Sequence, residues 1–167
     1  MKILVTGGAR SGKTGHALQL AEALAADRVY VATAEALDEE MRDRIRRHQD
    51  ERDPSWVTVE APLDPATALS APGRVVLLDC LTLWVNNLMC AELSDAEVRA
   101  RFGDLVEALL AAPNPVVLIT NEVGMGIVPM NAMARRFRDL QGWMNQDVAR
   151  VCDAAWLMAS GLPLQLK

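Results

Sequence analysis

The chain has 167 residues, of which 51% are hydrophobic and 23% are charged, and its net charge is −5 at pH 7. This length and composition are typical of one folded domain, so we expect a single domain spanning residues 1–167. The mildly negative charge argues against nucleic-acid or anionic-membrane binding, but it leaves room for one small anionic ligand in a local basic pocket.

The sequence also indicates where the protein works. No apolar stretch approaches the ~20 residues that cross a bilayer, and the opening MKILVTGG is too short in its apolar run for a signal peptide. Cys80, Cys90 and Cys152 are odd in number and form no C-x-x-C pair. A disulfide framework or a zinc site is therefore not expected, and we predict a cytoplasmic protein without a membrane partner.

Short apolar runs alternate with longer amphipathic segments. In chain order, the pattern predicts a strand over 3–6, a helix over 16–26, a strand over 29–33, a helix over 38–51, strands over 56–59 and 75–78, helices over 83–89 and 95–111, a strand over 115–120, a helix over 132–149, and strands over 155–159 and 162–166. This order favours an α/β fold with a mostly parallel sheet flanked by helices and an antiparallel C-terminal edge. Ligands of such sheets bind at the carboxyl ends of the strands, here Gly7, Thr33, Asp79 and Asn121.

A phosphate-binding motif occupies the first of these strand ends. The sequence GGARSGKT fits G-x-x-x-x-G-K-[ST] between a predicted strand and a predicted helix, which makes a chance glycine turn the weaker alternative. The glycines let backbone N–H groups face a phosphate at the positive end of the helix. Lys13 is expected to reach the outer phosphates, and the Thr14 hydroxyl to bind Mg²⁺. The predicted nucleotide-binding residues are Gly7, Gly8, Ala9, Arg10, Ser11, Gly12, Lys13 and Thr14.

Asp79 ends the apolar strand VVLLD, as the acidic residue of a Walker B element does. Its carboxylate could hold Mg²⁺ directly or through water. The alternative is an aspartate that caps the following helix. A P-loop fold binds nucleoside triphosphates, but it is shared by kinases, ATPases, GTPase switches and motors, so the function depends on the other residues.

His48 lies within the charged segment RIRRHQDER. Leu37, Met41, Ile45 and His48 follow one another at spacings of four, four and three, which places His48 on the apolar stripe of the predicted helix. It is then either a hydrogen-bonded core histidine or a nucleophile beside the nucleotide, because neutral imidazole can attack phosphorus. The other histidine, His16, is expected to be structural or to support the site.

These motifs occur together, and in order from residue 1 to residue 167, with YVATA, W-x-x-V-E-A-P, LLDCLTLWVNNL and VVLITNEVGMGIVP. The chain resembles the bifunctional adenosylcobinamide kinase/adenosylcobinamide-phosphate guanylyltransferase family. The resemblance implies a RecA-like P-loop NTPase fold and a homo-oligomer, in particular a trimer. Gly15 departs from the pattern, since many relatives carry a larger polar residue there, and the first turn of its helix is expected to be looser.

The resemblance also implies two reactions in adenosylcobalamin biosynthesis. In the first, the aminopropanol hydroxyl of adenosylcobinamide is phosphorylated by a nucleoside triphosphate, ATP or GTP. In the second, GMP passes from GTP through a guanylyl-histidine to adenosylcobinamide phosphate, which gives adenosylcobinamide-GDP and pyrophosphate. The implied cofactors are GTP, ATP and Mg²⁺, and the implied partner is adenosylcobinamide or its phosphate.

Family roles fall on particular residues of this chain. Catalysis is implied for His48, as the guanylylated residue, and for Lys13; Mg²⁺ binding falls on Thr14 and Asp79. Besides the phosphate loop, the implied nucleotide contacts are Ala32, Thr33, Ala34, Gln49, Asp50, Glu51, Arg52, Glu60 and Asp79. Without the resemblance, a solvated acid at a strand end is the preferred reading of Glu60.

Other readings stay open. Asn121 and Glu122 either line the site or form a turn around the following glycines, and Met125 and Ile127 suit either a corrinoid or a subunit contact. One rival function is a P-loop kinase of another small molecule, in which His48 is structural. The other is a non-catalytic nucleotide-dependent switch.

Overall fold

The computed structural model describes all residues except 36–38, 40–41, 44–45, 47–53 and 73. The strands are β1 (Lys2–Gly7), β2 (Arg28–Ala32), β3 (Trp56–Glu60), β4 (Val75–Asp79), β5 (Val116–Ile119), β6 (Ala154–Ala159) and β7 (Leu162–Gln165). The helices are α1 (Lys13–Leu24), α3 (Leu81–Cys90), α4 (Asp95–Ala111) and α5 (Ala132–Val151), with a 3₁₀ helix η1 (Pro65–Leu69). All of the predicted strands, and the predicted helices other than 38–51, are confirmed, with ends that differ by a few residues.

Most of the predicted helix over 38–51 lies outside the described residues. Glu39, Arg42, Asp43 and Arg46 are described, and each is helical and exposed. An ion pair joins Arg46 to Asp43 over 3.8 Å, one turn apart on the helix. The four residues therefore form a solvated charged face, as their polar character suggests.

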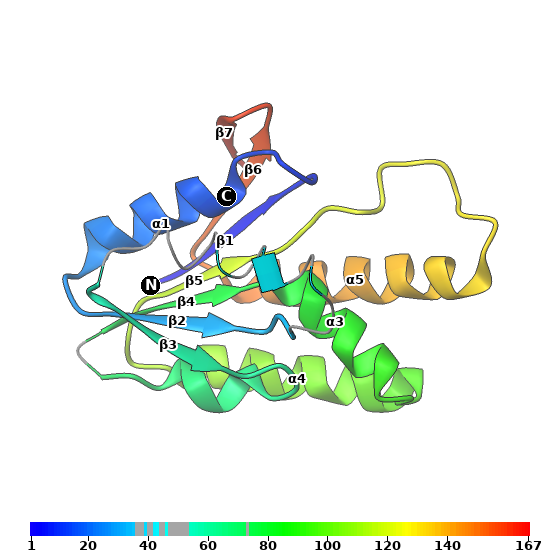
Figure 1. The fold of residues 1–167 in the computed structure, drawn as a ribbon, viewed down its shortest axis with the longest axis horizontal. Coiled ribbons are helices and arrows are strands. Elements are labelled where there is room, and N and C mark those ends of the chain that lie inside the picture. The colour runs from blue at the N-terminus through cyan, green and yellow to red at the C-terminus, as the bar shows by residue number, and fades with distance from the viewer. Residues whose placement is uncertain (36–38, 40–41, 44–45, 47–53, 73) are drawn as a thin grey trace.

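The strands form one seven-stranded sheet in the order β3-β2-β4-β5-β1-β6-β7 (Figure 1). Every neighbouring pair is parallel except β6 and β7. The predicted fold class is confirmed, including the antiparallel C-terminal edge. Because the parallel strands run the same way, their carboxyl ends share one edge of the sheet. β5 separates β1, which leads into the phosphate loop, from β4, which ends at Asp79.

Helices cover both faces of the sheet (Figure 1). Along β4, Val75 and Leu77 pack in the core cluster beneath α1, whereas Val76 and Leu78 pack in the cluster beneath α3, α4 and α5. All four are fully buried, so the inner strands are apolar on both faces rather than alternating with polar residues. Burying each such side chain contributes roughly 1.5–3 kcal/mol before the entropy of ordering is subtracted.

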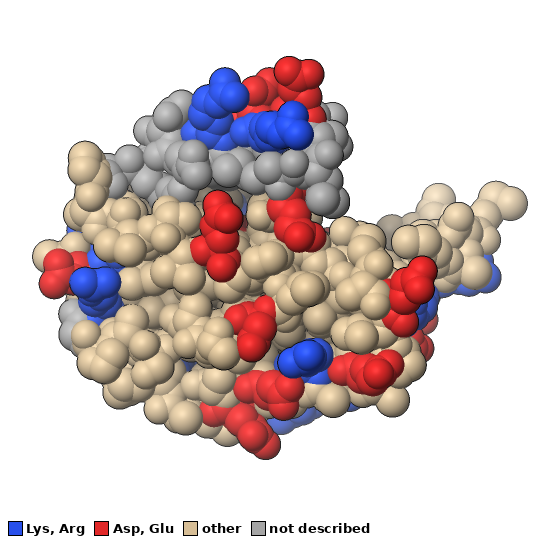
Figure 2. Space-filling view, turned by 60° about the horizontal axis from the view of Figure 1, so that its bottom comes forward, with Lys and Arg blue, Asp and Glu red and all other residues tan. Residues whose placement is uncertain are grey.

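Figure 2 shows acidic and basic side chains scattered among other residues over one face of the molecule. Among the described residues, no helix is both long and apolar enough to cross a membrane. The largest departure from the layered body is the segment from β5 to α5. It makes a wide excursion beyond the carboxyl edge of the sheet before α5 returns beneath it (Figure 1).

Candidate functional site

The phosphate loop lies between β1 and α1, where the motif places it. Gly12 caps the N-terminus of α1 with a φ of 92°, a left-handed conformation that favours glycine. A Cβ on Gly12 would lie 3.3 Å from the Cα of Gly161. A Cβ on Gly7 would lie only 2.6 Å from both the Met158 carbonyl oxygen and the Ser11 Oγ. Side chains at Gly7 and Gly12 would therefore fill the loop or displace its neighbours.

The loop offers donors that fit a phosphate group. The N-terminus of α1 begins after Gly12, so the first N–H groups of the helix and the helix dipole favour an anion there. Ser11 is buried, and its hydroxyl has no hydrogen-bond partner among the described residues. The Lys13 ammonium donates to the Gly8 carbonyl oxygen over 2.9 Å at the exposed side of the loop. A buried hydroxyl without a partner is costly unless a ligand or water satisfies it.

Two backbone hydrogen bonds hold the phosphate loop from outside. The N–H of Gly161, in the turn between β6 and β7, donates to the Ser11 carbonyl oxygen over 3.0 Å. The N–H of Glu122, just after β5, donates to the Gly7 carbonyl oxygen over 3.2 Å. The loop is thus fixed by segments more than 100 residues away in the sequence.

A buried polar network fixes the end of β5 that supports the loop. The Thr120 hydroxyl donates to the Asn145 Oδ1 over 2.7 Å and accepts from the Gln141 Nε2 over 2.8 Å. The Asn145 amide donates to the Asn121 carbonyl oxygen over 3.0 Å, and the Asn121 N–H donates to the Thr82 hydroxyl over 2.7 Å. The main chain of Asn121 is therefore held by α5 on one side and by α3 on the other.

Glu122 takes part in a turn. Its carboxylate accepts from the backbone N–H of Gly124 over 2.8 Å. Of the two readings left open by the sequence, the structure shows turn chemistry for this residue.

Asp79 lies at the carboxyl end of β4 with its side chain on the α1 face, because it follows Val75 and Leu77 at alternate positions of the strand. Its Oδ2 accepts from the Tyr30 hydroxyl over 2.5 Å. The N-cap of α3 is Cys80, whose sulfur accepts from the Leu83 N–H, so the alternative reading of Asp79 as the helix cap is not what the structure shows.

Asp79 and the phosphate loop face the same side of the sheet. Two strand spacings, about 10 Å in total, separate β4 from β1. The half-buried Thr14 and Asp79 supply a hydroxyl and a carboxylate, the hard oxygen donors that Mg²⁺ prefers. Within the described part of the chain, no group of three or more His, Cys, Asp or Glu residues could hold a metal alone.

Thr33 joins the ends of β2 and β4. Its N–H donates to the Asp79 carbonyl oxygen over 3.0 Å, and its hydroxyl donates to the Cys80 carbonyl oxygen over 2.8 Å. Its own carbonyl oxygen accepts from the buried Asn87 amide over 2.8 Å. Every polar group of Thr33 thus has a partner within the chain. Direct contact of Thr33, and of its half-buried neighbours Ala32 and Ala34, with a nucleotide stays a prediction.

Glu60 ends β3 at the same edge and is exposed. β3 is four strands from β1, or roughly 19 Å, so Glu60 lies at the outer end of the site relative to the phosphate loop. The catalytic prediction for His48, and the contacts predicted for Gln49, Asp50, Glu51 and Arg52, fall outside the described residues.

His16 packs against β6. Its ring meets Trp156 edge-on, with centroids 5.4 Å apart, and burial lowers its pKa from the usual value. This contact supports a structural role. A Cβ on the neighbouring Gly15 would meet nothing within 4 Å, so the position has room for the larger residue of its relatives.

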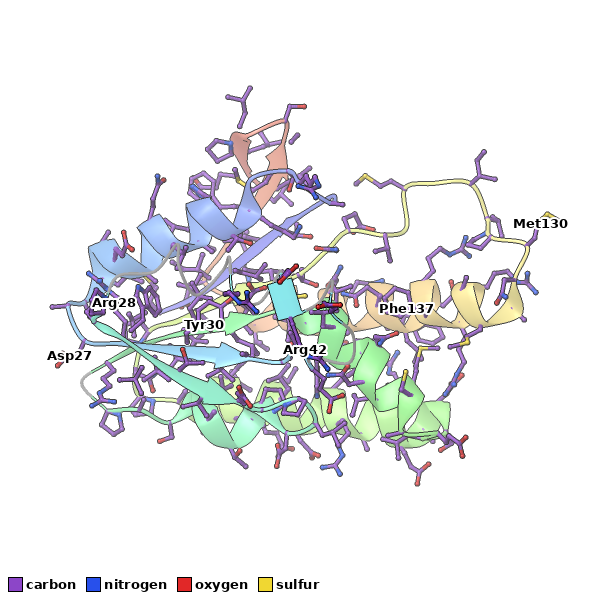
Figure 3. The ribbon with its side chains drawn as sticks, viewed as in Figure 1. Asp27, Arg28, Tyr30, Arg42, Met130 and Phe137 are labelled. Carbon is purple, nitrogen blue, oxygen red and sulfur yellow. The ribbon has the colours of Figure 1, made fainter. Side chains whose placement is uncertain are left out.

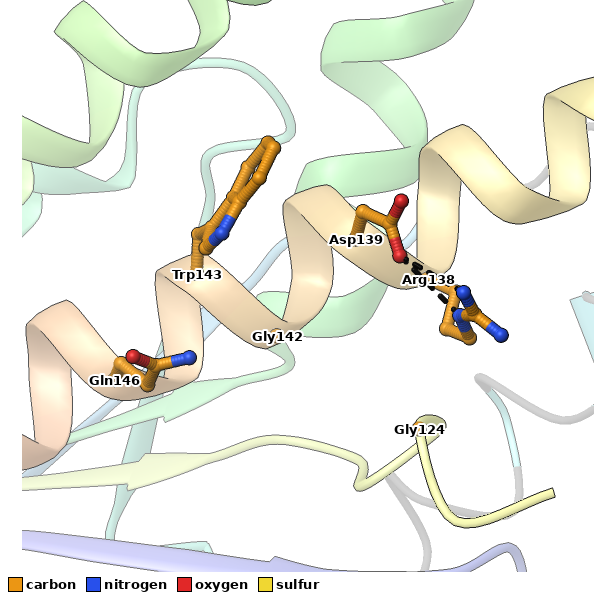
Figure 4. Close-up of a pocket in the computed structure, with 6 residues that line it drawn as sticks. All are labelled: Gly124, Arg138, Asp139, Gly142, Trp143 and Gln146. Atoms are coloured by element: carbon orange, nitrogen blue, oxygen red, sulfur yellow. Dashed lines mark hydrogen bonds and ion pairs between the residues drawn. The ribbon is translucent and has the colours of Figure 1, made fainter. Parts of the chain in front are cut away.

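A shallow pocket lies between the β5–α5 segment and α5 (Figure 4). Its volume is about 280 Å³, and its lining residues are Gly124, Arg138, Asp139, Gly142, Trp143 and Gln146. The Arg99 guanidinium lies 5.1 Å from the Trp143 ring centroid. Beyond the pocket, the segment carries exposed apolar side chains: Met125 is 80% exposed, and Ile127 and Met130 are each 98% exposed. Figure 3 shows Met130 pointing away from the body of the molecule.

Sequence reasoning did not single out Tyr30 or Gly161. Tyr30 lies two residues before Ala32 in β2, so the two side chains point to the same face of the sheet. Because Ala32 was predicted to contact the nucleotide, this spacing could have identified Tyr30 as a residue near the site. Gly161 becomes part of the site only because the C-terminal hairpin folds back to β1, and no local pattern reveals that contact.

The whole chain matches a known family. Residues 3–166 match the family model described as "Cobinamide kinase / cobinamide phosphate guanyltransferase". The chain belongs to this CobU family. The family predicted from the sequence motifs is confirmed, and with it the prediction of an enzyme with kinase and guanylyltransferase activities.

Three curated relatives align with this chain over nearly their full length. The bifunctional adenosylcobalamin biosynthesis protein CobU of Salmonella typhimurium is 44% identical over 185 aligned positions, which cover 100% of both chains. The Escherichia coli protein of the same name is 41% identical with the same coverage. The bifunctional adenosylcobalamin biosynthesis protein CobP of Pseudomonas aeruginosa is 41% identical and covers 100% of this chain and 98% of its own.

Among solved structures, the P4 protein of bacteriophage phi6 in complex with ADP is similar, with a TM-score of 0.51 and 19% identity. The match covers 97% of this chain and 52% of that protein. At this identity the likeness concerns the fold alone, and it agrees with the predicted P-loop NTPase architecture.

Proposed function

We propose that this protein is a one-domain cytoplasmic enzyme that phosphorylates adenosylcobinamide and then transfers GMP to adenosylcobinamide phosphate. The family name, which describes a cobinamide kinase and cobinamide phosphate guanyltransferase, and the names of relatives in adenosylcobalamin biosynthesis support the proposal. The observation that carries the proposal is an intact phosphate loop facing Asp79, in a chain that matches this family from end to end. The cytoplasmic location is supported by free cysteines at positions 80, 90 and 152.

The phosphate loop binds the triphosphate in both reactions. Backbone N–H groups from Gly7 to Gly12 and the end of α1 surround the phosphates, and Lys13 exchanges its contact with Gly8 for the outer phosphates. Thr14 and Asp79 would hold Mg²⁺, which would offset charge on the phosphate oxygens. In the kinase reaction the acceptor hydroxyl attacks the γ-phosphorus and releases its proton to solvent, and the bond from the γ-phosphorus to the departing nucleoside diphosphate breaks.

His48 carries GMP in the second reaction. A ring nitrogen attacks the α-phosphorus of GTP, a P–N bond forms, and pyrophosphate leaves. A phosphate oxygen of adenosylcobinamide phosphate then attacks the same phosphorus and restores the imidazole. Gln49, Asp50, Glu51 and Arg52, which follow His48, contact the nucleotide together with Ala32, Thr33 and Ala34. Glu60, at the outer end of the same edge, accepts from guanine N–H groups in this proposal.

The acceptor approaches from the β5–α5 segment. The 280 Å³ pocket is smaller than the ~300–1,000 Å³ of pockets that enclose small ligands, so it would take only one edge of a corrinoid.

The exposed Met125, Ile127 and Met130 suit a subunit contact in a trimer. An Ile127→Asp variant should then sediment as a smaller species, whereas an unchanged sedimentation coefficient would place the contact elsewhere.

Product analysis separates this function from its rivals. Incubation with adenosylcobinamide, GTP and Mg²⁺, followed by mass spectrometry, should yield adenosylcobinamide-GDP and pyrophosphate. A kinase of another small molecule would produce neither, and it would also fail to phosphorylate adenosylcobinamide. A nucleotide-dependent switch would give slow release of inorganic phosphate without a modified corrinoid.

A further inference from the structure

Tyr30 contacts the predicted metal ligand from the middle of the sheet. Its hydroxyl lies 2.5 Å from the Asp79 Oδ2, a short hydrogen bond to a carboxylate. Only 5% of the Tyr30 surface is exposed, and its ring belongs to the core cluster beneath α1. Tyr30 is also the only tyrosine in the chain. Packing in this cluster requires only an aromatic ring. The hydroxyl adds a hydrogen bond to an acidic residue at the ligand-binding edge of the sheet, which suggests a role beyond packing.

The ring of Tyr30 is fixed by its neighbours. β2 lies between β3 and β4, and Tyr30 stands opposite Leu77 on β4. The Trp56 ring from β3 meets the Tyr30 ring edge-on, with centroids 6.2 Å apart. The Arg28 guanidinium lies 5.7 Å from the centroid of Trp56, and Arg28 and Tyr30 follow one another along β2 in Figure 3. The hydroxyl therefore occupies a defined point relative to β4.

Thr33, the residue just after β2, holds the backbone of Asp79. The Asp79 carbonyl oxygen accepts from the Thr33 N–H over 3.0 Å. The N–H of Cys80 donates to the Thr33 hydroxyl over 2.9 Å. Tyr30 in β2 therefore holds the carboxylate of Asp79, and Thr33 at the end of that strand holds the peptide that follows it.

We propose that Tyr30 is a positioning residue that fixes the Asp79 carboxylate for the Mg²⁺ of the bound triphosphate. The inference rests on the proposed function, which assigns that metal to Asp79. A carboxylate on a single bond can rotate, and a hydrogen bond to Oδ2 restricts that rotation, so that Oδ1 would be the oxygen offered to the metal. Partners that orient metal ligands in this way typically change metal affinity by 10–100-fold when they are removed.

The test measures Mn²⁺ binding directly, by the loss of the free-ion electron paramagnetic resonance signal, with a non-hydrolysable GTP analogue bound to the full-length protein. Tyr30→Phe removes one oxygen atom and should weaken Mn²⁺ binding about tenfold. Trp156→Phe, the matched control, alters an aromatic ring on β6 that packs against His16, four strands from β2, and should bind Mn²⁺ as the unmodified chain does. Binding by Tyr30→Phe within twofold of the unmodified chain would overturn the inference.

A double-mutant cycle shows whether Tyr30 acts through Asp79. Asp79→Asn should weaken Mn²⁺ binding by itself, and adding Tyr30→Phe should then change it no further. If the two effects instead multiply, Tyr30 acts by another route and the inference fails. If Asp79→Asn binds Mn²⁺ normally, the failure lies in the proposed metal role of Asp79 and not in the step from Tyr30 to Asp79.

A spectroscopic signature gives a second readout that does not require replacing Tyr30. Because the chain has one tyrosine, growth on 3-fluorotyrosine places a single fluorine label beside Asp79. Adding Mg²⁺ to the protein bound to the GTP analogue should shift its ¹⁹F resonance, and the shift should vanish in Asp79→Asn. A ¹⁹F chemical shift that stays unchanged when Mg²⁺ binds would contradict the inference.

Discussion

The backbone N–H of Gly161 donates to the carbonyl oxygen of Ser11 over 3.0 Å, so the C-terminal hairpin holds the phosphate loop directly. Gly161 adopts a φ of 82°, and the residue before it, Ser160, has a φ of 53°. The turn brings the Gly161 Cα to within 3.3 Å of the place where a Cβ on Gly12 would stand. The shape of the nucleotide site therefore depends on the last strand pair of the sheet.

A Gly161→Ala substitution should lower both stability and nucleotide affinity. A Cβ there meets no atom within 4 Å, so its cost is the left-handed backbone, about 1–2 kcal/mol. Urea unfolding and calorimetric titration with a GTP analogue measure the two effects. Gly103→Ala is the matched control, because Gly103 is an exposed position of α4 with equal space. It should raise the free energy of unfolding by about 0.5–1 kcal/mol, and a loss in this control would contradict the explanation.

Replacing Lys13 by alanine should separate binding from folding. Its ammonium contacts the Gly8 carbonyl oxygen at the exposed side of the loop, so the unfolding midpoint should move little. Affinity for GTP should fall about tenfold or more, because a cation beside the outer phosphates is lost. Affinity for guanosine, which has no phosphate, should not change. An equal loss for guanosine would show that the substitution disturbs the loop as a whole.

The capping box at the start of α4 should give stability a specific pH dependence. The Ser94 hydroxyl, and then its backbone N–H, hold the pKa of the Glu97 carboxyl below its usual value. Since the folded-state pKa is the lower one, this stabilisation is complete above the unfolded value of about 4.3 and is lost as the pH falls through the folded value. Urea midpoints measured below about pH 4.3 should fall less steeply in Glu97→Gln and in Ser94→Ala. Identical slopes in all three chains would contradict the assignment.

Alkylation at pH 8 should distinguish the three cysteines. Burial, with a smaller contribution from the Asp79 carboxylate, raises the pKa of Cys80 to about 11, and burial raises that of Cys152 to about 12. Both thiols are therefore protonated and covered, whereas Cys90 is exposed. Intact mass after iodoacetamide treatment should show one modification, located on Cys90 by peptide mapping, and three in urea. Rapid native modification of Cys80 would contradict this environment.

Local pattern in the sequence sufficed for the strands and most of the helices. The run Val75–Leu78 is apolar at every position because both faces of its strand are covered. The glycines at positions 7 and 12 predict a loop, and in the structure the close contacts of this loop leave no room for a Cβ at either position. The family followed from the order of several motifs along the chain, since the phosphate loop alone is shared by many functions.

Long-range contacts were harder to predict. Tyr30 contacts Asp79, 49 positions away in the sequence, because β2 and β4 are neighbours in the sheet. The local sequence of a strand does not predict which other strand lies beside it. The sequence likewise offered two readings for Asp79, and the structure decides between them because Cys80, and not Asp79, caps α3. Thr33 was predicted as a nucleotide contact, but its polar groups are all engaged in joining β2 to β4 and α3.

The central claim is covalent transfer of GMP through His48, and GTP labelled at the α-phosphate tests it most directly. Incubation with Mg²⁺ followed by denaturing separation should leave label on the protein that is lost in acid and retained in base, as a P–N bond requires. Adenosylcobinamide phosphate should remove the label, and His48→Asn should never acquire it. Label that persists in His48→Asn, or that adenosylcobinamide phosphate cannot discharge, would contradict the account.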